Sequence, residues 1–250
     1  MRKTNICLVV GGSGGIGSEI CRELSRSGFS VAIGYYSDKR TAENLEMELK
    51  KNGAMVCCVN LNVNSEKSVQ AAVAEASKSL KGEILYLVYT PGDNLTYRSV
   101  IEMNWSQIED KINLFSRGLW YCLQTMLSKM KENKFGRIVV INTSYSWGVP
   151  PTNLADYVIG KYSQVGVMKT AALELGTYGI TVNCVSPAMT QTDRLKAVPD
   201  LAKKITAAQN PLRRLAVPND VANTVLFLLG EKSSYLNGVD LPVAGGAVMR

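Results

Sequence analysis

The chain has 250 residues, is 46% hydrophobic and carries a formal net charge of +7. This length and apolar content fit one α/β domain with a full core, and no apolar stretch approaches the roughly 20 residues of a membrane-spanning helix. The chain contains no histidine, which excludes a Ser-His-Asp triad, a Cys-His pair and most zinc sites. Any acid–base catalysis would therefore depend on Tyr, Lys, Asp or Glu.

The cysteines indicate the cellular compartment of the protein, and the net charge indicates the kind of partner it binds. The six cysteines lack metal-ligand spacing and lie mostly in apolar runs, so we expect no metal site and reduced core thiols in a cytoplasmic protein without membrane association. A positive net charge suggests anionic partners such as nucleotide phosphates, phosphopantetheine or an acidic carrier protein. Nucleic acid is the weaker interpretation, because the positive charges are scattered and no zinc-finger or RNA-binding signature is present.

Short apolar runs alternate with longer amphipathic segments along the whole chain. The apolar runs predict strands at 6–10, 31–35, 55–59, 84–89, 136–142, 181–186 and 236–243. The amphipathic segments predict helices around 15–27, 39–52, 66–80, 105–133, 156–178 and 218–230. This alternation favours a single doubly wound α/β domain over residues 1–250, with a mostly seven-stranded parallel sheet flanked by helices. Residues 188–217 contain no predicted strand and are rich in charge, so we expect a substrate lid there.

A glycine cluster, Val10-Gly-Gly-Ser-Gly-Gly-Ile-Gly17, joins the first predicted strand to the first predicted helix. Glycines allow a tight turn and a close approach of the backbone to a pyrophosphate, and the N–H groups and dipole of the helix start favour an anion. We therefore expect a dinucleotide cofactor there. Its predicted contacts in this cluster are Gly11, Ser13, Gly14, Gly15, Ile16 and Gly17.

The end of the second predicted strand bears on the choice between NAD and NADP. A carboxylate at this point would bind both hydroxyls of an NAD ribose and repel a 2′-phosphate, but the chain has Tyr35 there. Ser37, Lys39 and Arg40 follow, so we expect NADPH/NADP as the cofactor. Asp38 lies nearby and keeps NAD open as the less favoured alternative.

Tyr157 and Lys161 stand four residues apart in a predicted helix, and Ser144 lies thirteen residues before Tyr157. The four-residue spacing puts the phenol and the ammonium on one helix face. A nearby cation favours ionisation of a phenol, which makes it a useful acid–base group at neutral pH. The sequence therefore predicts a catalytic tyrosine supported by a lysine.

These motifs resemble the short-chain dehydrogenase/reductase family over essentially the whole chain. The family's glycine motif, Thr-Gly-x-x-x-Gly-x-Gly, lies over residues 10–17, with valine in the threonine position. The types of its catalytic tetrad fall on Asn113, Ser144, Tyr157 and Lys161. The resemblance implies a Rossmann-type fold, and it implies further cofactor contacts at Asn62, Val63, Gly92, Tyr157, Lys161, Pro187, Ala188, Thr190 and Thr192.

The resemblance also implies how a ketone would be reduced. Ser144 would hydrogen-bond the carbonyl oxygen and Tyr157 would donate the proton. Lys161 would lower the pKa of the phenol and hold the nicotinamide ribose. Asn113 would hold a water that joins Lys161 to solvent.

Two segments depart from the family pattern. Tyr89-Thr-Pro-Gly92 replaces Asn-Asn-Ala-Gly after the fourth predicted strand, so the bracing that the family's first asparagine provides must be arranged otherwise. Pro187-Ala188 replaces Pro-Gly, which removes backbone freedom at the start of the lid.

Within the family the chain is most similar to the 3-oxoacyl-[acyl-carrier-protein] reductases. This likeness implies reduction of a 3-oxoacyl thioester, carried by a carrier protein or CoA, in fatty-acid or polyketide-type biosynthesis, by a homotetramer. The gap between tyrosine and lysine is shorter than in the family's enoyl reductases. The predicted substrate pocket comprises Ser144, Tyr145, Ser146, Trp147, Leu154 and Met189. The residues predicted to dock the carrier protein are Lys129, Lys131, Lys134 and Arg137.

Two other functions remain open at this point. A dehydrogenase or reductase of a free small alcohol or ketone would explain why Tyr178 replaces a second docking arginine. A cofactor-binding regulator without turnover is the third possibility, because the altered 89–92 segment permits it.

Overall fold

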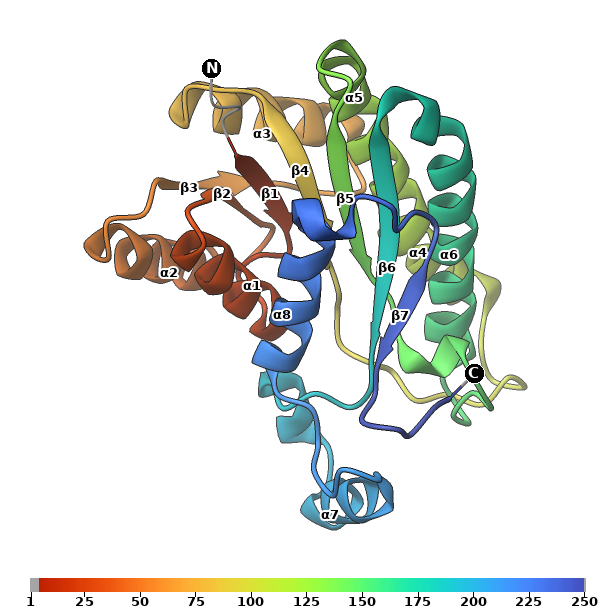
Figure 1. The fold of residues 1–250 in the computed structure, drawn as a ribbon. Helices are drawn as coiled ribbons and strands as arrows, with labels where there is room; N and C mark the ends of the chain where they lie inside the picture. Colours follow the sequence, from red (N-terminus) through yellow and green to blue (C-terminus); the bar gives the residue numbers. More distant parts are fainter. Residues whose placement is uncertain (1–4, 250) are drawn as a thin grey trace.

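The computed structural model describes residues 5–249, apart from the side chain of Ala197, and is built on one parallel sheet covered by helices on both faces (Figure 1). The strand order is β3-β2-β1-β4-β5-β6-β7, and every neighbouring pair is parallel. The strands are β1 Ile6–Val10, β2 Ser30–Tyr35, β3 Val56–Asn60, β4 Ile84–Tyr89, β5 Gly136–Ile141, β6 Ile180–Pro187 and β7 Asp240–Val243. The predicted doubly wound Rossmann-type fold is confirmed.

The last strand is shorter than the sequence suggests. It was expected at 236–243, but β7 begins at Asp240. The Asn237 side chain accepts a hydrogen bond from the Val182 N–H at 2.9 Å, and Gly238, at φ +76°, donates its own N–H to the Val182 carbonyl. A side chain and a left-handed glycine thus complete the edge of β6 before ladder pairing begins.

Eight α-helices are present among the described residues. They are α1 Gly15–Arg26, α2 Lys39–Lys51, α3 Glu66–Ser79, α4 Trp105–Ile112, α5 Gly118–Glu132, α6 Ala155–Leu175, α7 Asp200–Gln209 and α8 Pro218–Leu229. Helices α1, α2 and α8 pack together on one face of the sheet, and α3, α5 and α6 cover the other (Figure 1). The helix expected around 105–133 is interrupted by a π-helical turn at Asn113–Arg117. Helix α7 lies within residues 188–217, the segment expected to be a lid and called the lid below, where no helix was predicted.

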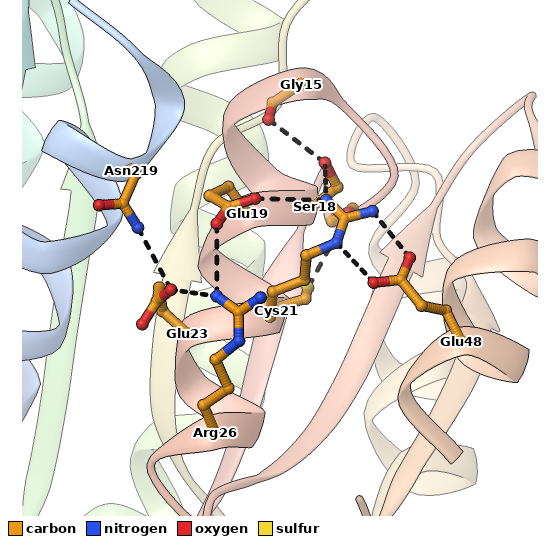
Figure 2. Close-up of polar contacts among 10 residues, drawn as sticks. Gly15, Ser18, Glu19, Cys21, Glu23, Arg26, Glu48 and Asn219 are labelled. Atoms are coloured by element: carbon orange, nitrogen blue, oxygen red, sulfur yellow. Dashed lines mark hydrogen bonds and ion pairs between the residues drawn. The ribbon is translucent and has the colours of Figure 1, made fainter. Parts of the chain in front are cut away.

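Polar contacts tie α1 to its two neighbouring helices (Figure 2). Arg22 makes a two-pronged ion pair with Glu48 of α2, with nitrogen–oxygen distances of 2.8 and 2.9 Å. Glu23 accepts a hydrogen bond from Asn219 of α8 at 3.2 Å and pairs with Arg26. These contacts hold α1 against α2 and α8.

The carboxyl ends of the central strands meet at one edge of the sheet. Val10 of β1 is in register with Tyr89 of β4, and Ile141 of β5 is in register with Val185 of β6. Ligands of open α/β sheets bind in the crevice outside this edge, where the strand order reverses between β1 and β4. The loops after β1, β4, β5 and β6 therefore converge on one site.

The interior is apolar and contains most of the thiols. Cys7, Cys21, Cys57, Cys122 and Cys184 are buried, Cys58 is half-buried, and all six are free thiols. Within residues 5–249 no helix is both long and apolar enough to cross a membrane. No group of His, Cys, Asp or Glu side chains in the same range is arranged to hold a metal ion.

Candidate active site

Lys161 lies on α6 and is only 4% exposed. Its Nζ donates hydrogen bonds to the Ile141 carbonyl at 2.7 Å and to the Gln164 Oε1 at 3.1 Å, and it lies 4.0 Å above the centre of the Phe115 ring. The same ring contacts Tyr157 edge-to-face, with ring centres 5.7 Å apart. Phe115 therefore supports both members of the tyrosine–lysine pair.

Burial dominates the electrostatics of this pair. It lowers the pKa of Lys161 to about 7 and raises the pKa of Tyr157 above its ordinary value. Hydrogen bonding to Thr143 and the charge of Arg194 lower the Tyr157 pKa but do not offset its burial. The expectation that Lys161 lowers the pKa of the phenol is therefore wrong. Burial raises the Tyr157 pKa, and it also disfavours the charged form of Lys161 that would have opposed this effect.

Ser144 begins a short 3-10 turn, Ser144–Ser146, directly after β5, and its side chain is buried. Asp240 supports this turn. Its carboxylate accepts hydrogen bonds from Ser186 Oγ at 2.6 Å, Trp147 Nε1 at 3.1 Å and Asn142 Nδ2 at 3.3 Å. Sequence reasoning missed Asp240, although an acidic residue at the start of a C-terminal strand is a signal that could have found it.

Asn113 is half-buried and begins the π-helical turn between α4 and α5. Gly118 donates its N–H to the Asn113 carbonyl, five residues back, which is the π-helical spacing often seen at functional sites. Gln164 connects this turn to the lysine, because its Nε2 donates to the Phe115 carbonyl at 3.2 Å while its Oε1 accepts from Lys161. Gln164 is fully buried three residues after Lys161, and sequence reasoning missed it.

The unusual segment after β4 braces the sheet by a different contact. The hydroxyl of the buried Tyr89 donates to the Leu114 carbonyl in the π-helical turn at 2.6 Å. A Cβ at Gly118 would collide with this hydroxyl. Lys111 on α4 adds a 2.6 Å ion pair to Asp93, just after Gly92. These contacts attach the segment to α4 and α5.

The glycine loop has the backbone that a dinucleotide needs. Gly11 has φ +76°, and a Cβ there would lie 2.6 Å from the Thr90 carbonyl oxygen; a Cβ at Gly17 would collide with Gly11. Gly14 is the N-cap of α1 and provides no side chain to cap it, so the first N–H groups of α1 are free to bind an anion. A Cβ at Gly15 would lie 2.7 Å from Thr192 of the lid. Ser13 and Ile16 lie in the same loop, and these residues fit a nicotinamide dinucleotide.

Asp38, which the sequence left as a competitor for the ribose, is engaged elsewhere. It is the N-cap of α2 and accepts hydrogen bonds from Thr41 N at 2.9 Å and Thr41 Oγ1 at 2.7 Å. Lys39 forms an exposed ion pair with Glu43 at 3.4 Å. Arg40 and Ser37 are exposed beside the half-buried Tyr35 at the end of β2.

The remaining predicted cofactor contacts lie around the same edge. Asn62 accepts a hydrogen bond from the Asn64 N–H at 3.0 Å, and Val63 is buried just after β3. Pro187 ends β6, and Ala188 accepts a 2.8 Å hydrogen bond from Thr190 Oγ1. Together with Gly92 and Thr192, they surround the carboxyl edge of the sheet.

The predicted substrate wall is only partly open. Tyr145, Ser146, Trp147 and Met189 are half-buried, but Leu154 is only 1% exposed and forms local core at the start of α6. Burial also raises the pKa of Tyr145. Leu154 is therefore unavailable as a contact surface, because its side chain is buried.

The predicted carrier-docking residues lie at the other end of the sheet, where α5 leads into β5 (Figure 1). Arg137 is buried, donates to the carbonyls of Gly136 and Gly179, and stacks on Phe135. Its role as a docking residue is wrong, because its guanidinium is held inside the protein. Lys129 pairs with Glu132 and Glu83, Lys131 lies over the Tyr178 ring, and Lys134 remains exposed before β5.

Comparisons with known proteins agree with this geometry. Residues 11–248 match the family described as Enoyl-(Acyl carrier protein) reductase. The chain is 34% identical over 252 residues to the 3-oxoacyl-[acyl-carrier-protein] reductase FabG of Staphylococcus aureus, and 32% identical over 252 residues to an acetoacetyl-CoA reductase of an Acinetobacter species; both matches cover 100% of each chain.

Solved structures have the same fold. Acetoin dehydrogenase YohF from Salmonella typhimurium matches with a TM-score of 0.86 and 25% identity over 97% of this chain and 96% of its own. Levodione reductase matches with a TM-score of 0.91 and 22% identity over 98% of both chains, and supports the fold alone. On its full-length similarity, the chain belongs to the short-chain dehydrogenase/reductase family of NAD(P)-dependent oxidoreductases.

Proposed function

We propose that the protein is an NADPH-dependent reductase of 3-oxoacyl thioesters, bound to a carrier protein or to CoA, and yields the 3-hydroxyacyl thioester in fatty-acid or polyketide-type biosynthesis. The observation that carries the proposal is the buried Tyr157–Lys161 pair on Phe115, in a chain with full-length similarity to two reductases of 3-oxoacyl thioesters. We treat residues 1–250 as one catalytic domain.

In this proposal each residue of the site has a defined task. The loop Gly11–Gly17 would hold a nicotinamide dinucleotide, which would supply a hydride to the carbonyl carbon and so leave negative charge on the oxygen. Ser144 donates a hydrogen bond to that oxygen, and Tyr157 donates the proton that neutralises it. Lys161, with a pKa of about 7, binds the ribose hydroxyls and helps to replace the proton on Tyr157. Gln164 and the Ile141 carbonyl hold its Nζ in place.

NADP is favoured over NAD by the second strand. Tyr35 stands where a carboxylate would repel a 2′-phosphate, Asp38 caps α2, and Arg40 is exposed nearby. The spacing of Tyr157 and Lys161 also supports ketone reduction over double-bond reduction, whatever the description of the matching family.

A free small ketone is the second candidate substrate. Acetoin dehydrogenase, at 25% identity, is a structural relative, and the burial of Arg137 removes one of the residues expected to dock a carrier protein.

A homotetramer is supported by large apolar side chains that α4, α5 and α6 expose: Trp105, Trp120, Ile159 and Leu173. Light scattering of the purified protein would measure its mass.

One assay tests the function. NADPH and NADH oxidation would be followed with an acetoacetyl thioester on carrier protein, with acetoacetyl-CoA and with acetoin. We expect the highest kcat/KM for a thioester with NADPH, and a loss of about 100- to 10,000-fold in Tyr157→Phe with NADPH binding retained. Tyr235→Phe, at a fully exposed tyrosine, is the matched control and should retain wild-type turnover.

Three results would contradict the proposal. Turnover by Tyr157→Phe at the wild-type rate would remove the proton donor from the mechanism. A clear preference for acetoin would favour the second candidate. Dinucleotide binding without turnover of any ketone would indicate a cofactor-binding regulator instead of an enzyme.

A further inference from the structure

The lid contacts both glycine-containing loops at the carboxyl edge of the sheet. The Thr192 side chain packs against Gly15 at the start of α1, where a Cβ would lie 2.7 Å from Thr192 Cβ. Two residues later, the Arg194 guanidinium lies against Gly92 after β4, so that a Cβ there would collide with it. The segment Thr192–Arg194 therefore spans the space between the phosphate-binding loop and the β4 loop.

The charge of Arg194 acts on the two catalytic residues Tyr157 and Lys161. Its guanidinium is close enough to lower the pKa values of both Tyr157 and Lys161. An exposed residue on a short 3-10 turn, Asp193–Ala197, thus places a permanent positive charge beside the groups that would handle the ribose and the proton.

The carboxylates nearest to Arg194 along the two loops have other partners. Asp193 pairs with Lys196 at 2.8 Å, and Asp93 pairs with Lys111 at 2.6 Å. Within residues 5–249 no acidic side chain forms an ion pair with Arg194. A cation without a counter-charge, directed into a binding crevice, is suited to an anion that a ligand brings.

We propose that Arg194 binds the diphosphate of the nicotinamide dinucleotide and so closes the lid over the cofactor. The free N–H groups of α1 would hold this diphosphate from one side, and the guanidinium would hold it from the other. A planar guanidinium matches two phosphate oxygens at once, which a methionine or leucine in the same place could not do. The inference depends on the use of a nicotinamide dinucleotide by this family and is independent of the thioester substrate.

The test measures dinucleotide binding directly, without turnover. Dissociation constants for NADPH and NADH would be measured by fluorescence or calorimetry for wild type, Arg194→Met and Arg194→Lys. We expect Arg194→Met to weaken binding by at least about tenfold and to flatten its dependence on salt, with a smaller loss in Arg194→Lys. Lys196→Met removes a charge from the same turn and is the matched control, expected to stay within about twofold of wild type.

A ligand fragment separates the diphosphate from the rest of the cofactor. Adenosine 2′-monophosphate lacks the diphosphate, so Arg194→Met should bind it as wild type does. An equal loss for this fragment would overturn the assignment to the diphosphate, and so would NADPH binding by Arg194→Met within twofold of wild type. If wild type binds neither dinucleotide, this inference and the proposed function fail together; if wild type binds and Arg194→Met is unaffected, only the inference fails.

Discussion

The floor of the site and the lid use charge in opposite ways. The floor, formed by Thr143, Tyr157, Lys161 and Gln164, is largely buried, and Lys161 is held by a backbone carbonyl and an amide. The lid, residues 188–217, holds exposed cations such as Arg194 and Lys196 on short turns. Burial makes the protonation of a floor residue depend on its surroundings, whereas an exposed lid cation can respond to a charged ligand. The floor should therefore determine the reaction, and the lid should determine how tightly charged ligands bind.

Replacement of the floor lysine should have a severe effect on turnover. In Lys161→Met we expect kcat/KM for the favoured thioester to fall by about 100- to 10,000-fold, because the amine that binds the ribose and helps to replace the proton on Tyr157 is lost. Lys169→Met, at an exposed lysine two turns further along α6, should stay within about twofold. Steady-state kinetics with NADPH would measure both, and equal activities of the two variants would show that Lys161 has no catalytic role.

The carboxylate of Asp240, beneath the Ser144 turn, should contribute more to stability than a carboxylate of the lid such as Asp200. Asp240→Asn leaves an amide facing three donors, so we expect the free energy of unfolding to fall by about 2 kcal/mol. Asp200→Asn removes only an exposed ion pair to Lys203 and should cost less than about 0.5 kcal/mol. Urea unfolding of the two variants provides the comparison, and similar losses would mean that the Asp240 network adds no stability.

Sequence patterns predicted the doubly wound parallel sheet, the glycine loop and the residue types around the floor, because each depends on local periodicity and spacing. Three features depended on contacts between distant segments. Tyr89 fits only because Gly118 leaves space for its hydroxyl, Gln164 ties Lys161 to the Phe115 carbonyl, and Arg137 donates a hydrogen bond to the Gly179 carbonyl. None of these contacts follows from the spacing along the chain.

The direction of the Tyr157 pKa could not be predicted for a related reason. The spacing of Tyr157 and Lys161 was known, but the burial of both groups was not. Desolvation opposes charge on either group and outweighs their proximity. The lid charge that reaches them comes from Arg194, more than thirty residues further along the chain.

The buried lysine should also make stability depend on pH. Its pKa is about 7 in the folded protein, against an ordinary lysine value of 10.5, so between these values the unfolded chain binds a proton that the folded protein does not. The free energy of unfolding should then rise with pH. From pH 7 to 8.5 we expect wild type to gain about 1.5 kcal/mol relative to Lys161→Met, measured by urea unfolding at each pH.

We expect this rise in the free energy of unfolding to end near pH 8.5, because the titration of other buried groups lowers stability above that pH. Burial raises the pKa values of Cys7, Cys21 and Cys184, so the unfolded thiols lose protons first and stability falls as the pH rises further. Lys196→Met, in the lid, should follow wild type throughout, because Lys196 is exposed to solvent and makes a surface ion pair with Asp193. If wild type and Lys161→Met change in parallel from pH 7 to 8.5, Lys161 stays protonated in the folded protein, and the floor would then hold a permanent charge as the lid does.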